Sequence, residues 1–393
     1  PDGTYTWNCL AYDNASLSDW ADSNWTVTVN YTVANNPPTV SNVILSSTSG
    51  NNLTTDNLTV IYDVSDPDND SVKNITNWYM DGNSITKLNM PFEGGSNLTW
   101  TKDYSGFGNN GIVSGSAWNS SGGYDGFGAY KFDGSNDLIQ VPDSSLWDIK
   151  KTDNITIEMW IKLASTIPGT YANLWGDWNG PCVQIYRTGG SDYLIWYGGG
   201  SGISQSNAVT LTPGTWYHIV VVKTAQTNVT FYQNMVNVGS AVPSDNDVTP
   251  DYIGIGGDEG GEYFNGTIDE VRIYNGSLSE EQIKALYENK TYFIVSQETA
   301  IGDTWKACVT PNDEAVDGTE VCSNNLTIVS DATPPVINLI APDNNSEDID
   351  GTILFEYNVT DDESAVNSCK SVSYTHLRAH ETSLHLVCRL LLE

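Results

Sequence analysis

Apolar residues recur at every second position along much of this chain. Leu58, Val60, Tyr62 and Val64 follow this period, and residues 155–163 repeat it. Because successive side chains of a strand point to opposite faces, the pattern predicts half-buried β-strands. Residues 216–222 are apolar at nearly every position, which predicts a strand buried on both faces.

One segment shows the period of a helix instead. Ser279 stands at its start with Gln282 three residues later, which is the spacing of a capping box. Ile283 and Leu286 supply an apolar stripe. We therefore expect an all-β protein with one short helix after residue 274.

Two signatures occur twice and reveal the domain order. A closing hairpin with a Trp, a Cys and an alternating strand covers residues 3–29 and returns over residues 302–329. An opening Pro-Pro strand begins at Pro37 and again at Pro334. The unit between Pro37 and Val329 is about 290 residues long, whereas a small β-sandwich needs about 100. The surplus predicts a second domain inserted into the first.

These boundaries divide the chain into five parts. They are the C-terminal part of one module (1–33), a module split by an insertion (37–87 and 291–330), the inserted domain (88–290), the start of a further module (334–372) and a tail (373–393).

Composition and net charge limit the classes of partner that the protein could bind. Hydrophobic residues make up 39% of the chain, which is enough for real cores, and the abundance of β-branched residues favours strands. With 49 acidic and 16 basic residues the formal net charge is −33, so phosphate backbones would be repelled and nucleic acid is excluded as a partner. No apolar run is long enough to predict a membrane span. The acidity indicates solubility, with calcium binding as the alternative.

Sequons and cysteines indicate export. Acceptors of the form Asn-x-Ser/Thr recur at Asn14, Asn24, Asn30, Asn57, Asn74, Asn97, Asn154, Asn228, Asn265, Asn289, Asn325 and Asn358. Such a density predicts a glycoprotein, although an Asn- and Thr-rich chain also produces sequons by chance. Cys308 and Cys322 flank a polar turn, which predicts a disulfide in an oxidising compartment. No C-x-x-C spacing points to zinc or to thiol redox chemistry.

The ends of the chain carry two further expectations. Gly3 already lies in a closing hairpin, so we expect the chain to be a fragment of a longer protein. Residues 373–393 contain three of the four His and resemble translated adapter sequence, so we interpret them as a non-native tail. A short basic tail is the alternative.

The inserted segment resembles a laminin-G-like jelly roll of the concanavalin A-like lectin/glucanase superfamily. Five ordered motifs carry the resemblance: 103–111 (DYSGFGNNG), 129–139 (AYKFDG followed by DLI), 157–162 (IEMWIK), 215–220 (TWYHIV) and 266–274 (GTIDEVRIY). The flanking parts resemble immunoglobulin-like modules of prokaryotic surface proteins. The resemblance implies a sandwich of two curved antiparallel sheets, inserted in an immunoglobulin-like domain.

Glycosidases of this superfamily need two or three carboxylates on one strand. No Glu-x-Asp-x-Glu pattern occurs, and Glu158 stands alone on its predicted strand. His218 is the one His outside the tail and lies in mid-strand, which favours packing or a hydrogen bond. We therefore predict that the protein is not an enzyme.

A structural Ca²⁺ is the one cofactor that the sequence indicates. The resemblance places Asp103, Asn109 and Asp269 in motifs that meet at one edge of the related jelly rolls, with Asp133 and Asp137 as the alternative set. Calcium takes six to eight oxygen ligands of this kind. The competing interpretation is turn chemistry, since Asp and Asn beside Gly are typical of tight turns.

Sugar binding needs exposed aromatic rings with polar groups around them. The candidate ligand-binding residues lie in three short segments: Trp175, Asp177, Trp178 and Asn179; Trp196 and Tyr197; and Asp258 and Glu259. Core packing is the competing interpretation for Trp175 and Trp196, whereas Trp178 is expected to be exposed.

Taken together, the sequence predicts a non-catalytic, extracellular cell-surface protein for recognition or adhesion. Its jelly roll would bind carbohydrate or a glycoprotein. The alternatives are a purely structural stalk or surface-layer module, and the accessory binding module of a larger glycan-degrading enzyme.

Overall fold

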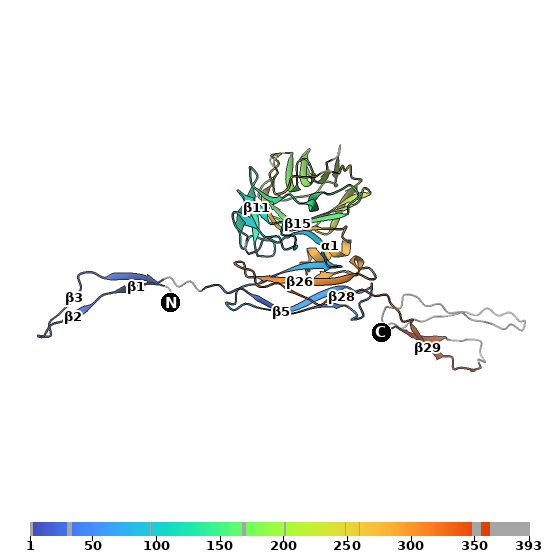
Figure 1. The fold of residues 1–393 in the computed structure, drawn as a ribbon, viewed down its shortest axis with the longest axis horizontal. Coiled ribbons are helices and arrows are strands. Elements are labelled where there is room, and N and C mark those ends of the chain that lie inside the picture. The colour runs from blue at the N-terminus through green and yellow to red at the C-terminus, as the bar shows by residue number, and fades with distance from the viewer. Residues whose placement is uncertain are drawn as a thin grey trace, which may run out of the picture.

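The protein is built almost entirely of β-strands. The computed structural model describes residues 3–29, 34–94, 96–166, 170–199, 202–247, 249–258, 260–347 and 355–361. A large jelly roll lies on one face of a smaller sandwich, whose sheet containing β26 is the nearer layer (Figure 1). The tail at 373–393, Cys369 and Glu259 lie outside the described residues.

The first jelly-roll sheet has eight strands in the order β10-β11-β14-β23-β16-β17-β18-β19. Their bounds are Trp100–Thr101 (β10), Gly111–Ser114 (β11), Leu138–Pro142 (β14), Tyr252–Ile255 (β23), Tyr171–Gly176 (β16), Pro181–Thr188 (β17), Ser191–Gly198 (β18) and Ile203–Gln205 (β19). All neighbouring pairs are antiparallel. A short 3₁₀ turn at Ser145–Trp147 follows β14.

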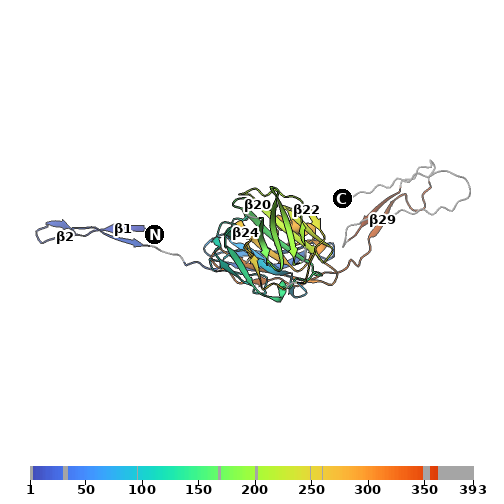
Figure 2. The same cartoon turned by 90° about the horizontal axis from the view of Figure 1, so that it is seen from above.

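The second jelly-roll sheet runs in the order β12-β13-β24-β15-β20-β21-β22, with β9 also paired to β24. Its strands are Ala117–Asn119 (β12), Ala129–Asp133 (β13), Asn265–Tyr274 (β24), Ile155–Leu163 (β15), Trp216–Thr224 (β20), Asn228–Gln233 (β21), Val236–Ala241 (β22) and Thr86–Met90 (β9). Figure 2 is the view from above and labels β24, β20 and β22 of this sheet, in which β15 lies between β24 and β20 and β21 between β20 and β22. The predicted all-β fold class, with a jelly roll of two antiparallel sheets, is confirmed.

The core of the jelly roll lies between the two sheets. Every second residue of β15, from Ile155 to Leu163, is buried in it. The intervening Thr156, Glu158 and Trp160 are buried as well. The period of β15 predicts a half-buried strand, and this prediction is wrong because the outer face of the strand is also covered. The two-sided burial predicted for residues 216–222 is found in β20.

Helix α1 (Glu280–Tyr287) provides part of that cover. Ile283 packs on Val220 and Val222, on the outer face of β20. The Ser279 side chain accepts a hydrogen bond from the Gln282 backbone N–H at 3.2 Å, as expected for the N-cap. The prediction of the reciprocal half of the capping box is wrong, because the Gln282 side chain binds Phe293 and Val295 instead. The Ser279 N–H donates to Glu298 at 2.7 Å in its place.

The smaller sandwich is made of strands from both sides of the jelly roll. One sheet contains Phe293–Ile294 (β25), Leu58–Ser65 (β6) and Thr39–Ser47 (β5), and the other contains Val321–Cys322 (β27), Thr304–Asn312 (β26), Lys73–Met80 (β7), Asn83–Ser84 (β8) and Leu326–Thr327 (β28). Strand β26 pairs with β7 from Trp305↔Met80 to Asn312↔Lys73. Trp78 and Trp305 meet edge to face in the shared core. A 3₁₀ turn at Ser296–Glu298 precedes β26.

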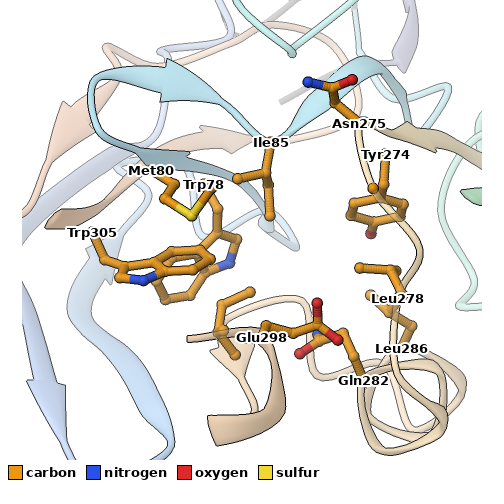
Figure 3. Close-up of a pocket in the computed structure, with 12 residues that line it drawn as sticks. Trp78, Met80, Ile85, Tyr274, Asn275, Leu278, Gln282, Leu286, Glu298 and Trp305 are labelled. Carbon is orange, nitrogen blue, oxygen red and sulfur yellow. The ribbon is translucent and has the colours of Figure 1, made fainter. Parts of the chain in front are cut away.

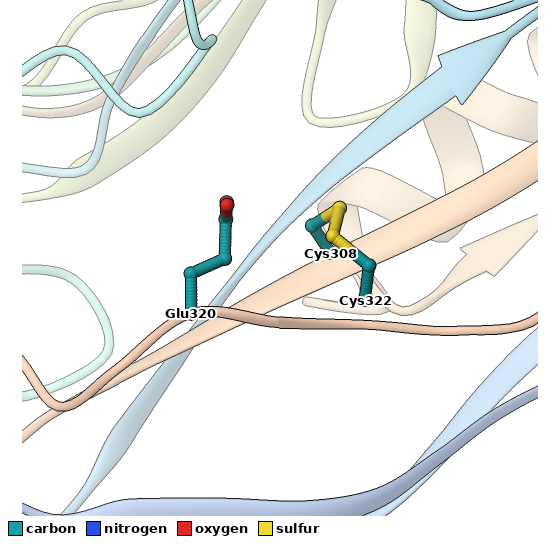
Figure 4. A group of neighbouring side chains, drawn as sticks. All are labelled: Cys308, Glu320 and Cys322. Atoms are coloured by element: carbon teal, nitrogen blue, oxygen red, sulfur yellow. A yellow bond between two sulfur atoms is a disulfide. The ribbon is translucent and has the colours of Figure 1, made fainter.

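The predicted disulfide between Cys308 and Cys322 is confirmed, and it links neighbouring positions of β26 and β27 (Figure 4). The Glu320 carboxylate lies near both sulfur atoms, so the three side chains have the spacing of potential metal ligands. Because both sulfurs are committed to the disulfide, this grouping is not a metal site.

Two further pieces flank the central body. Strands Gly3–Trp7 (β1) and Trp25–Val29 (β4) pair at one end, and Leu10–Tyr12 (β2) pairs with Ser18–Trp20 (β3). Val336–Ala341 (β29) and Glu356–Thr360 (β30) pair at the other. Trp7 and Trp25 are 56% and 68% exposed, so the first hairpin buries little by itself. The immunoglobulin-like assignment of these modules stays a prediction. No helix in the described ranges is long and apolar enough to cross a membrane.

Candidate ligand-binding site

The hairpin loop between β16 and β17 presents the most exposed Trp of the jelly roll. Trp178 is 51% exposed. The loop is closed by two backbone hydrogen bonds, from Asp177 N–H to Pro181 at 3.3 Å and from Gly180 N–H to Asp177 at 3.1 Å. Gly176 before it has φ +119°, and a Cβ there would meet the Pro181 carbonyl at 2.3 Å. The sequence thus folds the loop tightly and leaves the indole outside.

A second loop, between β23 and β24, supports the indole from below. A Cβ on Gly260 would meet the Trp178 ring at 2.6 Å and Asp258 Oδ1 at 3.0 Å. The backbone of Gly260 therefore lies directly against the ring, at a separation that no other residue permits. Trp178 is a supported, half-exposed platform rather than a free side chain.

Acidic groups lie beside this platform, and we call Asp258 and Glu262 the loop acids. Asp258 is fully buried, and its Oδ2 has no hydrogen-bond partner in the described part of the chain. Burial raises the pKa of Asp258, and the nearby Asp177 raises it further. Burial also raises the pKa of Glu262, with a second contribution from Asp258. Neither loop acid forms an ion pair with a described basic side chain.

Neutral oxygens complete the patch. The amide of Asn173 on β16 donates to the carbonyls of Gly257 at 3.1 Å and Gly176 at 3.5 Å, the residues before Asp258 and Asp177. Asn173 Oδ1 is buried and without a partner among the described residues. Gln184 donates to Glu262. A cluster of buried and half-buried oxygens without a described basic partner fits hydroxyl groups or a divalent cation.

Two of the predicted binding residues lie in the core of the jelly roll instead. Trp175 and Trp196 are 0% and 1% exposed and stack on each other in the core, so the prediction that they contact ligand is wrong. Their rings point between the sheets because strands β16 and β18 place them on the inner face. Tyr197 is half-buried and Asn179 is exposed.

The predicted calcium residues are engaged in turns. The Asp103 carboxylate accepts four hydrogen bonds, from Asn89 N–H, from the N–H and hydroxyl of Ser105, and from Asn109 N–H, all at 2.7–3.0 Å. In the alternative set, Asp133 caps its own turn and Asp137 accepts from Asp133 N–H at 2.8 Å. These contacts match the turn chemistry that was the competing interpretation.

Asp269 belongs to a different group, at the junction of the two sandwiches. We call Glu93, Asp125, Asp269 and Glu270 the junction acids. Lys73 of β7 forms ion pairs with Asp125 and with Glu270, the latter at 2.5 Å. Arg272 pairs with Glu270 from the other side. Burial raises the pKa of Glu93 and Asp269 well above their usual values. Although burial opposes it, Arg272 and Lys73 lower the pKa of Glu270.

Glu158 and His218 form a closed contact rather than a site. His218 Nε2 lies 3.1 Å from Glu158 Oε1, and Tyr274 donates to Glu158 Oε2 at 3.2 Å. Both Glu158 and His218 are fully buried. The expected hydrogen bond of His218 is therefore present, with Arg272 completing the contact at 3.5 Å.

Sequence reasoning missed Asn173, Gln184 and the support that Gly260 gives to Trp178. Asn173 lies in a strand, where a hydrophobic or β-branched residue is usual. This unusual residue type is the sequence feature that could have pointed to a role in the site. Gln184 carries no such signal, because polar residues are ordinary on an outer sheet face.

Comparison with known proteins identifies the inserted domain. Residues 133–284 match the family model described as concanavalin A-like lectin/glucanases superfamily. No curated protein matches the chain significantly. Among solved structures, domain 4 of AbnA, a GH43 extracellular arabinanase from Geobacillus stearothermophilus, in complex with arabinotriose, is 20% identical with a TM-score of 0.40, covering 52% of this chain and 99% of that one.

Two toxin domains are also similar. The receptor binding domain of botulinum neurotoxin D is 17% identical with a TM-score of 0.42, covering 52% of this chain and 53% of that chain. The binding domain of Paraclostridial Mosquitocidal Protein 1 is 14% identical with a TM-score of 0.43, covering 70% of this chain and 75% of that one. The match thus spans about half the length of the neurotoxin domain.

Proposed function

The inserted jelly roll belongs to the concanavalin A-like superfamily, and we propose that it is a non-catalytic module that recognises carbohydrate on an extracellular surface. The observation that carries the proposal is the pairing of the exposed Trp178 ring with the oxygen-rich patch of the loop acids. A sugar needs both of these features, an apolar ring face for stacking and polar groups for directed hydrogen bonds to its hydroxyls.

The geometry favours a ligand at the patch over a purely structural role for it. The buried Asp258 Oδ2 and Asn173 Oδ1 have no donor among the described residues. Leaving such acceptors unpaired costs about 1–3 kcal/mol each, and sugar hydroxyls or a cation would satisfy them. The Trp178 ring is already held against Gly260, so little side-chain entropy is lost on binding.

The calcium expectation continues as a proposal, with a different set of residues. Asp103 has no free carboxylate oxygen for a metal, and the junction acids already surround Lys73. We propose the loop acids and Asn173 as the oxygen ligands instead, because neither loop acid is paired with a described base and Asp258 Oδ2 and Asn173 Oδ1 have no described partner. A bound cation would neutralise the loop acids and offer further positions to sugar hydroxyls.

Extracellular residence is part of the same proposal. The Cys308–Cys322 disulfide supports an oxidising compartment. Glycan occupancy of the sequons and attachment to a cell surface are proposed with it, and a glycoprotein partner would be recognised through its sugars.

A glycan array, probed in calcium and in chelator, tests the proposal. We expect the wild-type protein to bind a defined glycan class and Trp178→Ala to lose at least about tenfold in affinity. Trp100→Ala is the matched control, because Trp100 is a 39% exposed Trp on the same sheet, in β10 at its edge. Binding to no glycan in either condition would reject recognition and favour the stalk, and equal loss in both variants would reject the site.

A further inference from the structure

A cavity of about 150 Å³ lies where the two sandwiches and helix α1 meet (Figure 3). The smaller sandwich contributes Trp78, Met80 and Trp305 to its wall, and the jelly-roll side contributes Tyr274, Leu278 and Leu286. In Figure 3, Ile85 borders it opposite Glu298 and Gln282. Neither sandwich forms this cavity alone, so it exists only because one domain is inserted in the other.

Most of the wall is carbon, and among its buried polar side-chain groups Trp305 Nε1 has no hydrogen-bond partner in the described part of the chain. Gln282 Nε2 donates a hydrogen bond to the Phe293 carbonyl, and Gln282 Oε1 accepts one from Val295 N–H. Trp78 Nε1 donates to Thr291 O at 2.9 Å. Because a buried water molecule needs two to four polar partners, such a wall holds water poorly. An apolar cavity of about 150 Å³ is large enough for a benzene-sized molecule.

Glu298 supplies the one charge in the wall. Its Oε1 accepts from Ser279 N–H, and its carboxylate forms no ion pair with any basic side chain that the structure describes. It is half-buried, so the charge sits at the cavity rather than in open solvent. Asn275 on the opposite side is exposed and marks a route of entry.

We propose that this cavity binds a small single-ring amine, with the ring among the Trp and Leu side chains and the ammonium group against Glu298. The aromatic wall fits the ring, and a carboxylate without an internal counter-ion fits the ammonium. A free sugar does not fit, because its hydroxyls would find too few partners. The proposal is independent of the loop site, which lies elsewhere on the jelly roll.

Titration of the full chain with benzylamine, benzyl alcohol and toluene tests the proposal, by calorimetry and by the thermal unfolding midpoint. We expect one saturable site, benzylamine to bind tightest, and each bound ligand to raise the midpoint because it binds the folded state alone. Glu298→Gln keeps an acceptor for Ser279 N–H and should weaken benzylamine about tenfold while leaving toluene within about twofold. An unchanged benzylamine affinity in this variant would overturn the role of Glu298.

Filling the cavity gives the second test. Leu278→Trp should abolish binding of all three ligands, and Ile85→Phe, from the opposite wall, should weaken it about tenfold. Ile301→Trp is the control, since Ile301 is 66% exposed and does not line the cavity. Near-ultraviolet circular dichroism verifies folding of each variant. Undiminished binding in both filled variants, or no saturable binding in the wild type, would overturn the proposal, whereas glycan binding should not change in either.

Discussion

The junction acids and the loop acids are two groups of buried or half-buried carboxylates that differ in their basic partners. At the junction, Lys73 comes from the smaller sandwich and Arg272 from β24, and both lie against Glu270. At the loops, Asp258 and Glu262 have no described basic partner, and a third acid, Asp177, adds to the repulsion. Two of the junction acids, Asp125 and Glu270, are therefore paired with bases inside the fold, whereas neither loop acid has a described basic partner.

This contrast separates acidic residues with a structural role from those with a functional role in a chain that has 49 of them. A buried charge is tolerated when a partner and hydrogen bonds compensate its lost hydration. Where the fold supplies that partner, the acid has a structural role. The ion pairs of Lys73 with Asp125 and Glu270 also connect the smaller sandwich to the jelly roll. Where no basic partner is described and an exposed aromatic ring lies alongside, as at Asp258 and Trp178, the acid is a candidate for a binding site.

Removing the internal cation should have the largest effect. Lys73→Ala leaves the junction acids without one of their two bases, and breaking such a buried pair costs about 3–5 kcal/mol of unfolding free energy. Lys102→Ala is the control, because its ion pair with Asp317 is about one-third exposed on the Lys side and is worth about 1 kcal/mol or less. Chemical denaturation measures both. Equal losses would mean that Lys73 has no special role at the junction.

The pH dependence of stability should separate Glu93 from its neighbours. Burial raises the folded-state pKa of Glu93 well above 4.5, so its stabilising contribution is complete below about pH 4.5 and is lost as the pH rises through the folded-state value. Glu93→Gln removes this titration. Relative to wild type, the variant should therefore gain stability as the pH rises from about 4.5 to the folded-state pKa, by about 1.4 kcal/mol per pH unit. Denaturation midpoints at several pH values measure it, and parallel curves would refute it.

Neutralising a loop acid should have a smaller and opposite effect from the loss of Lys73. Backbone N–H groups of the loop stabilise the Asp258 charge only in part, because burial and Asp177 still raise its pKa and no described basic side chain pairs with it. For Asp258→Asn we therefore expect a gain of about 1 kcal/mol in unfolding free energy at pH 7. Ligand binding on the glycan array should fall in the same variant. A loss of stability as large as that of Lys73→Ala would show that Asp258 is structural, and the comparison between the two groups would fail.

The sequence predicted those features of the molecule that depend on short stretches of the chain. Alternation over residues 58–64 and 155–163 predicted strands, because it depends only on the geometry of a strand. The repeated hairpins and Pro-Pro strands predicted that residues on both sides of the insertion share a sandwich, and β26 pairs with β7. The helix N-cap at Ser279 was equally local.

What sequence could not predict depends on contacts between distant segments. The outer face of β15 is buried because α1 and the smaller sandwich cover its sheet, which no period within β15 reveals. Trp175 and Trp178 are three residues apart in one motif, yet one lies in the core and the other is 51% exposed. The decisive partner of Trp178 is Gly260, which lies 82 positions further along the chain.

The smallest effect on stability is expected at the platform itself. Trp178 is half-exposed and contacts a glycine backbone, so Trp178→Ala should change the unfolding free energy by no more than about 0.5 kcal/mol, as for most surface substitutions. Denaturation of this variant beside Asp258→Asn then gives a joint criterion. A binding site is a place where substitutions remove affinity and spare the fold, whereas the junction should behave in the reverse way. If Trp178→Ala destabilised the protein by about 3 kcal/mol, as truncation of a core Trp does, the ring would be packing, and its exposed face would need no ligand to explain it.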